Sequence, residues 1–310
     1  MIWNDKRYHS LNYYLKNKYG HKVYRLSLDG GMTCPNRDGR LGTGGCIFCS
    51  AGGSGDFAGS CQLSITEQLD SQIKKLQKKA DCESYIAYFQ AFSNTYAPVP
   101  YLKICYDQAL EHPKVSILSI ATRPDCLDND VLDLLEECNK EKPVWVELGL
   151  QTIHPHSAEF IRRGFDLSVF EEALANLRAR NIEVIVHVIL GLPTETREDM
   201  LNTIKYLSTK DIQGIKLHLL HVLKGTDLAT LYADCPFSLF TLDEYADLIC
   251  DCIELLPPHM VIHRLTGDGA KKDLIAPMWS GDKKRVLNTM NQRFIQRDTY
   301  QGRLFKGDNQ

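Results

Sequence analysis

The stretch Cys34-Pro-Asn-Arg-Asp-Gly-Arg-Leu-Gly-Thr-Gly-Gly-Cys46-Ile-Phe-Cys49 brings three thiols close together in a polar loop. Its glycines, together with Asn36 and Asp38, disfavour a regular helix and let the backbone fold tightly around a bound group. A Cys-x-x-Cys pair with a third cysteine nearby has the spacing of ligands to one metal ion or one cluster. The stretch therefore predicts a metal centre in this loop.

The three thiols by themselves leave two kinds of metal centre open. Three thiolates on a four-iron cluster leave one iron without a protein ligand, and such an iron can act on a bound small molecule. Cys61 follows Cys49 at the spacing that separates Cys34 from Cys46, so a four-thiolate zinc site is also compatible. Inert buried thiols fit a polar loop poorly, and a disulfide framework is typical of small secreted chains, not of 310 residues.

The composition indicates one large α/β domain or two medium ones, with 44% hydrophobic residues. The N-terminus has no apolar segment of the kind found in signal peptides, and no apolar run reaches membrane-spanning length. Eleven cysteines without an export signal are typical of a reducing compartment. We therefore expect a cytoplasmic protein that does not use a membrane.

Basic residues concentrate at the two ends of the chain, although the net charge is -3. Residues 1–25 contain six Lys or Arg and one Asp, and residues 280–310 contain seven Lys or Arg and three Asp. The N-terminal bases are interleaved with aromatic residues: Trp3, Tyr8, Tyr13, Tyr14, Tyr19 and Tyr24. Scattered charge usually covers a solvated surface, but this mixture also suits RNA, because cations contact phosphates and rings stack on bases.

Between residues 23 and 222 the hydrophobic pattern alternates between strands and helices. We predict strands at 23–28, 85–89, 115–120, 144–150, 182–190 and 215–222, separated by helices at 66–79, 99–110, 130–139, 168–180 and 197–208. Thr66 is the expected cap of the first of these helices. Such alternation implies a parallel sheet with right-handed crossovers, so the predicted fold is an α/β, partial (β/α)6 TIM-like barrel.

The regions outside this alternation are predicted as extensions. We expect residues 1–22 to form a basic and aromatic N-terminal extension with a helix at 8–19, residues 23–235 to form the core barrel, and residues 236–310 to form a C-terminal extension. The pattern in the last region predicts a helix within 237–256, a strand at 260–265 and a basic helix at 279–291.

Polar residues follow the predicted strands, and ligands of parallel α/β folds bind at the C-terminal ends of strands. We therefore expect one rim to carry the cysteine loop together with Gln90, Ser93, Asn94, Thr122, Arg123, Gln151 and Thr194. Polar residues often end strands because loops are solvated, but a thiol cluster on the same rim favours a site. Alternation along the strands places further polar side chains inside the barrel: Glu147, His187, Lys216 and His218.

Taken together, these stretches resemble the radical S-adenosylmethionine (SAM) superfamily, in particular the branch with the elongator catalytic subunit and oxygen-independent coproporphyrinogen oxidase. The matching stretches follow the family's order across residues 23–230: Cys34…Cys46-Ile-Phe-Cys49, Ala121-Thr-Arg-Pro-Asp125, Glu147-Leu-Gly-Leu-Gln151, Arg163-Gly164, His187-Val-Ile-Leu-Gly-Leu-Pro193-Thr-Glu195 and Lys224-Gly-Thr226. The chain ends are similar to those of a bacterial subgroup linked to tRNA wobble-uridine modification.

The resemblance implies a [4Fe–4S] cluster held by Cys34, Cys46 and Cys49, with SAM chelating the fourth iron. One electron from a flavodoxin- or ferredoxin-type donor would cleave SAM, and the resulting 5′-deoxyadenosyl radical would take a hydrogen atom from the substrate. Lys216 and His218 are the implied catalytic residues, on the substrate side. The implied cofactor-binding residues are Phe48, Gln90, Ser93, Asn94, Arg123, Glu147, Gln151, Arg163 and His187.

Three functions are compatible with these observations. The first is a radical SAM enzyme that modifies the C5 side chain of wobble uridine, with tRNA as partner. The second is a radical SAM enzyme acting on a small molecule such as a porphyrin precursor. The third is a non-catalytic, zinc-stapled RNA-binding protein, which metal analysis would distinguish because zinc sites contain no acid-labile sulfide.

Overall fold

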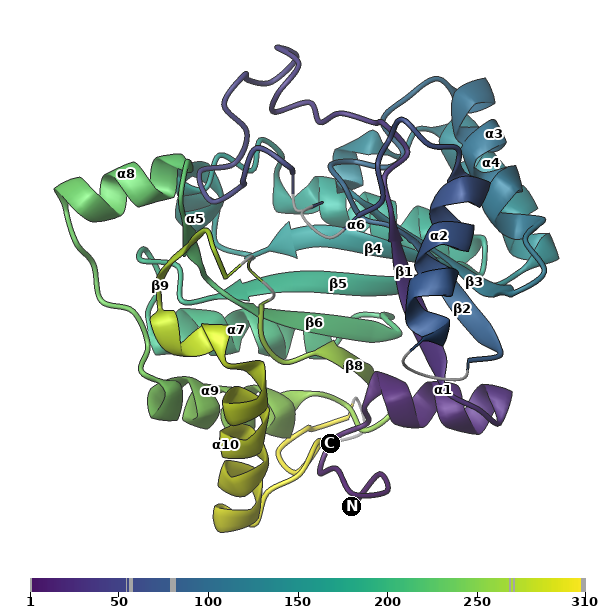
Figure 1. Cartoon of the computed structure of the whole chain (residues 1–310). Coiled ribbons are helices and arrows are strands. Elements are labelled where there is room, and N and C mark those ends of the chain that lie inside the picture. The colour runs from purple at the N-terminus through teal and green to yellow at the C-terminus, as the bar shows by residue number, and fades with distance from the viewer. Residues whose placement is uncertain are drawn as a thin grey trace.

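A curled seven-stranded parallel sheet forms the centre of the computed structural model (Figure 1). The structure describes residues 2–53, 55, 58–78, 82–267, 269 and 271–307. The strands lie in the order β1-β2-β3-β4-β5-β6-β8, and all neighbours pair in parallel. Their bounds are β1 Val23–Leu28, β2 Ser84–Phe89, β3 Val115–Thr122, β4 Val144–Gln151, β5 Glu183–Leu190, β6 Gly214–Leu219 and β8 Val261–Arg264. The predicted partial TIM-like barrel is confirmed, and the strand predicted at 260–265 adds a seventh member.

Helices cover the outer face of the sheet (Figure 1). They are α2 Ile65–Gln77, α3 Val99–Leu110, α4 Asn129–Glu141, α5 Pro155–Phe160, α6 Leu167–Ala179 and α7 Arg197–Ser208. The short α5 was not predicted, whereas α3 and α7 have the predicted bounds. In the described part of the chain, no helix is both long and apolar enough to span a membrane.

The start of α2 corrects one prediction. Ser64, not Thr66, is the N-cap. Its hydroxyl accepts a hydrogen bond from the backbone N–H of Glu67, and the Glu67 carboxylate accepts one from the backbone N–H of Ser64. This reciprocal pair satisfies two backbone donors at once, which a single side chain at Thr66 would not do. The predicted last position, Lys79, lies outside the described residues.

Alternation along the strands separates two interiors. In β4, Val144, Val146 and Leu148 are fully buried in the core between the sheet and its helices. Trp145 points the other way and packs with Ile185 in a second cluster inside the barrel. The same parity brings the polar side chains of β3 to β6 to the barrel interior, as the sequence predicted.

The N-terminal helix α1 (Leu11–Tyr19) packs against both edge strands, β1 and β8 (Figure 1). Leu15 is 3% exposed and joins the barrel-interior cluster, and Ser10 pairs with Ile262 of β8. Trp3 and Tyr8 are each only 8% exposed. These two rings therefore belong to the packed structure and are not available to stack on bases.

The C-terminal region adds a two-stranded antiparallel sheet and three helices. The elements are β7 Val222–Leu223, α8 Asp227–Asp234, α9 Leu242–Leu255, β9 Leu274–Ala276 and α10 Lys283–Gln296. The basic helix predicted at 279–291 is a short 3-10 turn (Met278–Gly281) followed by α10. The predicted polar tail from 298 is described only to residue 307.

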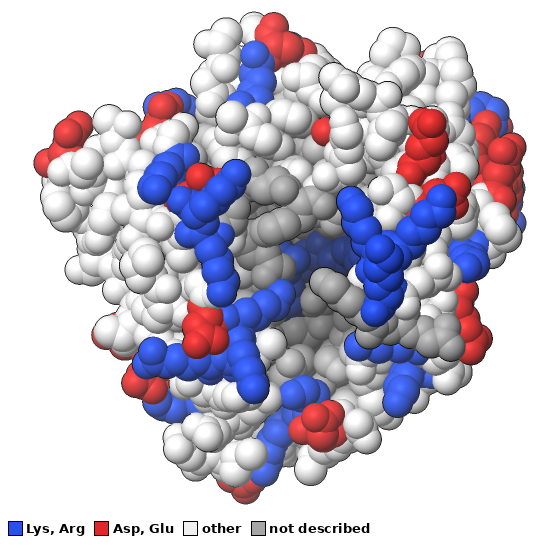
Figure 2. Space-filling model, viewed as in Figure 1, with Lys and Arg blue, Asp and Glu red and all other residues white. Residues whose placement is uncertain are grey.

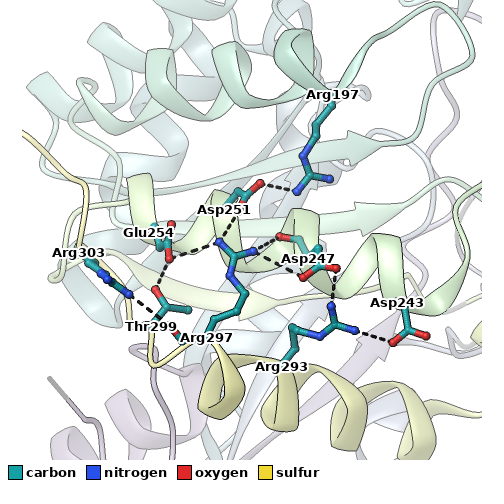
Figure 3. A network of polar contacts seen from close by, with 9 residues as sticks. All are labelled: Arg197, Asp243, Asp247, Asp251, Glu254, Arg293, Arg297, Thr299 and Arg303. Atoms are coloured by element: carbon teal, nitrogen blue, oxygen red, sulfur yellow. Dashed lines mark hydrogen bonds and ion pairs between the residues drawn. The ribbon is translucent and has the colours of Figure 1, made fainter.

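An ion-pair network joins α10 to α9 (Figure 3). Arg293 contacts Asp243 and Asp247 at 2.7 and 2.5 Å, and the Arg297 guanidinium lies 2.6 Å from Asp251. Arg197 at the start of α7 also pairs with Asp251. The basic C-terminus is thus neutralised in part by the acidic middle of the chain.

Arg297→Gln should lower the free energy of unfolding by about 1–2 kcal/mol, because one partly buried guanidinium contacts both Asp247 and Asp251. Urea unfolding measures the loss. Arg285→Gln is the matched control: Arg285 is exposed on the same helix, and no described acid pairs with it. An equal loss in both variants would contradict a specific role for the network.

Candidate functional site

A cavity of about 260 Å³ opens at the C-terminal ends of the barrel strands. Its walls come from the cysteine loop, from the strand ends of β2 to β6, and from the region after β8. Among the residues that the structure describes, four arginines and one acid, Glu147, line it: Arg37, Arg123, Arg163 and Arg264. Figure 2 shows a central hollow in the molecule with Lys and Arg side chains around it. The site therefore favours anionic groups.

Contacts within the cysteine loop hold Cys34, Cys46 and Cys49 at the cavity wall. The Asn36 side-chain amide donates to the Cys46 sulfur at 3.4 Å and to the Arg162 carbonyl at 2.7 Å. The Arg37 guanidinium donates to the carbonyls of Cys49 and Ser50, at 3.2 and 2.6 Å. Hydrogen bonds to sulfur and to the loop backbone are the outer contacts that orient metal ligands.

The donor set fits a four-iron cluster. Cys34, Cys46 and Cys49 share one cavity wall, whereas Cys61, the fourth thiol of the zinc alternative, is exposed and is not part of that wall. A four-iron cluster with three thiolate ligands binds each thiolate at a different iron and leaves its fourth iron for a small molecule.

Burial keeps Cys46 in the thiol form until a metal binds. Burial and, to a smaller extent, the neighbouring Cys49 raise the pKa of this thiol to about 12. A thiolate is the form that ligates metal, so binding must supply the positive charge that makes deprotonation favourable. The loop thus provides ligands whose ionisation depends on the metal.

Most of the predicted site residues meet at this one cavity. Those in its wall are Phe48, Gln90, Ser93, Arg123, Glu147, Gln151, Arg163, His187 and His218. Asn94 is fully buried and donates to the carbonyls of Phe89 and Ala121, so it joins strand ends and does not line the cavity. Lys216 is 1% exposed and is also absent from the wall.

The two arginines that the resemblance implies as cofactor-binding residues, Arg123 and Arg163, differ in their contacts. Arg123 makes a two-point contact with Asp125, at 2.8 and 2.7 Å, so its charge is balanced within the chain. Within the described part of the chain, Arg163 donates to the backbone carbonyls of Leu150, Thr152 and Phe165. Burial lowers the pKa of Arg163 to about 10, so it remains a cation. Of these two, Arg163 is the cation without an acid in hydrogen-bond contact.

Glu147 holds together a polar layer beneath the cavity. Its carboxylate is fully buried and accepts hydrogen bonds from Lys216, from Ser119 at 2.9 Å and from His187 at 2.7 Å. Arg25 lies 3.5 Å away. Although burial opposes ionisation, the adjacent cations Lys216 and Arg25 keep the pKa of Glu147 well below its usual range. These contacts occupy the carboxylate that the resemblance implies as a cofactor-binding group.

The two histidines of the barrel interior lie side by side, with ring centroids 5.1 Å apart. Burial, followed by the positive charge of Lys216, lowers the pKa of His187 to about 4, so a neutral ring donates its Nε2 proton to Glu147. Burial also lowers the pKa of His218 well below its usual value. The Nε2 atom of His218 is buried without a hydrogen-bond partner among the described residues. His218 thus offers an unused polar atom at the cavity wall.

Two further residues carry features of a ligand-binding wall. Gln151 has a left-handed backbone with φ of 64°, an uncommon conformation for a residue with a side chain, and it ends β4. The hydroxyl of Ser93 is fully buried at the cavity wall, and the Cys126 thiol is its hydrogen-bonding neighbour. A hydroxyl has one donor and two acceptor positions, so Ser93 can also bond a ligand atom in the cavity.

The structure also adds cavity residues that the sequence did not single out. They are Arg37, Tyr88, Phe92, Phe165, His221 and Arg264. Arg37 lies within the quoted cysteine loop and could have been found there. Arg264 ends β8, beyond the regular strand–helix alternation, and its place at the cavity depends on parallel pairing of β8 with β6. Only the fold reveals that contact.

Cys34→Ser, Cys46→Ser and Cys49→Ser should each lower bound iron and acid-labile sulfide severalfold or more, because each removes one of three cluster thiolates. Metal and sulfide analysis of anaerobically prepared protein measures this. Cys61→Ser is the control and should keep both at the unsubstituted level, because Cys61 lies outside the cavity wall. Loss of iron in Cys61→Ser alone would overturn the assigned ligand set.

Glu147→Gln should lower the free energy of unfolding by about 3–5 kcal/mol, because Lys216 and Arg25 are left without their buried counter-charge. Adding Lys216→Met should recover part of that loss, since it removes one uncompensated cation. Urea unfolding at neutral pH compares the two variants. Glu136→Gln, at a half-exposed glutamate on α4, should change stability by less than about 0.5 kcal/mol. A fully additive double variant would contradict the coupling.

Comparison with known proteins identifies the family. Residues 37–207 match the radical SAM superfamily, and residues 212–296 match the radical SAM C-terminal domain. The chain is 46% identical to the Bacillus subtilis protein YtqA, over 97% of this chain and 94% of that protein. Its fold is similar to that of the Methanocaldococcus infernus Elp3 with an N-terminal deletion, with a TM-score of 0.69 and 15% identity. That alignment covers 90% of this chain and 64% of the solved chain.

A more distant relative is named for a tRNA position. The tRNA uridine(34) acetyltransferase of Methanocaldococcus jannaschii is 25% identical over 62% of this chain, which corresponds to 34% of that protein. The resemblance stated from the motifs is therefore confirmed at the level of the superfamily and of its elongator-like branch. The chain belongs to the radical SAM superfamily, whose enzymes use a [4Fe–4S] cluster and SAM.

Proposed function

We propose that this radical SAM enzyme modifies the C5 side chain of the wobble uridine in tRNA. The observation that carries the proposal is the extent of the cavity, which runs from the three cysteines to His218 and Arg264 at the far strands. One end therefore suits SAM at the cluster and the other suits a substrate group. The distant relative named for uridine 34 of tRNA supports a nucleotide as that group.

The residues at the cysteine end suit the cofactors. When bound, the cluster and SAM supply reductive cleavage of the sulfonium and a radical that takes a hydrogen atom from the substrate. Cys34, Cys46 and Cys49 would hold the cluster, and Phe48 between them offers a ring to the SAM adenine. Ser93 and Gln151 would hydrogen-bond the polar part of SAM. Asn94 and Glu147 would instead position the site. Asn94 binds the ends of two strands, and Glu147 binds His187 and Lys216.

The opposite end of the cavity suits the substrate. The Nε2 atom of His218 has no hydrogen-bond partner among the described residues, and this neutral ring can donate or accept one hydrogen bond. Lys216 is held by Glu147 and lies 3.2 Å from the Tyr88 hydroxyl, so its part in the proposal is to support the wall. We thus assign the substrate-facing role to His218. Apolar residues nearby, including Ile189 and Leu220, would keep water from the reacting carbon.

Two linked experiments test this function. Anaerobic protein with dithionite and SAM should release 5′-deoxyadenosine, because the chain belongs to the radical SAM superfamily. Nucleoside analysis of tRNA from cells lacking the gene should show a changed wobble uridine. The gene should restore the profile, whereas a Cys46→Ser copy should not. An unchanged tRNA profile beside normal SAM cleavage would refute the tRNA substrate and favour a small molecule.

A further inference from the structure

The basic residues at the ends of the chain are not the free cationic surface that their number suggests. Arg7 pairs with Asp298 at 2.7 Å, and Lys18 lies 3.8 Å from Glu183. Arg293 and Arg297 are engaged by the acids of α9 (Figure 3). An ion pair within the chain reduces the potential that a phosphate would meet. The chain ends therefore offer a polyanion less free charge than their number of bases suggests.

Lysines of α2 form one exposed basic surface. Lys74, Lys75 and Lys78 are exposed near the end of this helix, and no described acid forms an ion pair with them. Leu69 and Ile73 bury the other face of α2, so the lysines project toward solvent. In Figure 2, Lys and Arg side chains gather beside the central hollow over α2, on the right of the view.

A second group lies at the opposite side of the hollow, near the β7–β9 pair. Lys224, Lys271 and Lys272 are exposed, and among the described residues none has an acidic partner. The ammonium group of Lys224 donates to the Lys272 carbonyl at 3.1 Å, which holds these two residues together. Leu223, the neighbour of Lys224, lines the cavity. Figure 2 shows basic side chains over this region as well.

We propose that these two groups, here named the lysine rim, bind RNA phosphates on either side of the nucleotide that enters the cavity. The rim consists of Lys74, Lys75, Lys78, Lys224, Lys271 and Lys272. This inference rests on the proposed tRNA substrate and specifies the surface that binds it. Exposed lysines contact phosphates as point charges and position a strand without reading its sequence.

The shape of the surface favours RNA over a flat anionic partner. The two lysine groups flank a hollow, whereas a lipid bilayer would present its charge as a plane. The cavity wall between them contains aromatic rings, Phe48, Phe92 and Phe165, on which a base can stack. The chain has a net charge of -3, so any attraction for RNA must come from such a local surface.

The test measures tRNA affinity of the full-length holoenzyme at several salt concentrations. Two triple variants remove the rim, Lys74→Gln/Lys75→Gln/Lys78→Gln and Lys224→Gln/Lys271→Gln/Lys272→Gln. Each should weaken binding by about tenfold or more, and each lost phosphate contact should reduce the logarithmic salt slope by about one. The control, Lys103→Gln/Lys140→Gln/Lys205→Gln, removes three exposed lysines that pair with acids on outer helices. It should bind tRNA like the unsubstituted protein.

The outcomes separate this inference from the proposed function. Suppose that the unsubstituted enzyme binds and modifies tRNA while both rim variants keep its affinity and salt slope. The phosphate-binding role of the lysine rim is then refuted, and the proposed function stands. If the unsubstituted enzyme neither binds nor modifies tRNA, the function itself fails. Equal weakening in the control and rim variants would also reject the rim, because the effect would then follow net charge. Circular dichroism and thermal unfolding identify any variant that has lost its fold.

Discussion

The buried carboxylate of Glu147 is the interaction on which the interior of the barrel depends. It lies on β4 and contacts Arg25 of β1, Ser119 of β3, His187 of β5 and Lys216 of β6. Lys216 in turn reaches Tyr88 of β2. One carboxylate therefore connects six of the seven strands through side chains, where a purely apolar interior would fix no particular arrangement. A buried charge is tolerated because its partners surround it.

This layer explains why some predicted site residues do not touch the cavity. Strand parity correctly places Glu147, His187, Lys216 and His218 inside the barrel, because side chains alternate with a period of two. Parity does not say how deep along the strand a side chain ends or which neighbour it binds. Lys216 lies one layer below His218, and Glu147 holds it there. The sequence thus predicts which face a residue occupies, and tertiary contacts decide its accessibility.

The fold was easier to predict from the sequence than the pairing of charged side chains. The β–α alternation from 23 to 222 predicts the first six strands of the main sheet, since each is a short apolar run between amphipathic helices. The strand predicted at 215–222 is too long, because β6 ends at Leu219 and Val222 begins β7 in the second sheet. Pairings between distant residues, such as Arg7 with Asp298 or Arg297 with Asp251, leave no local signal. The two basic chain ends suggested a phosphate-binding surface. In the structure, these pairings use part of that charge in contacts that hold α10 and the N-terminus in place.

Packed side chains separate the cavity from the N-terminal helix. Leu15 of α1 packs with Trp145 and Ile185 at the N-terminal ends of the strands, and the layer around Glu147 lies above them. The cavity lies beyond that layer, where the cysteine loop meets the C-terminal ends of the strands. A polymer that cannot enter a barrel can still insert one nucleotide into such a cavity, so a packed barrel interior is compatible with a large substrate.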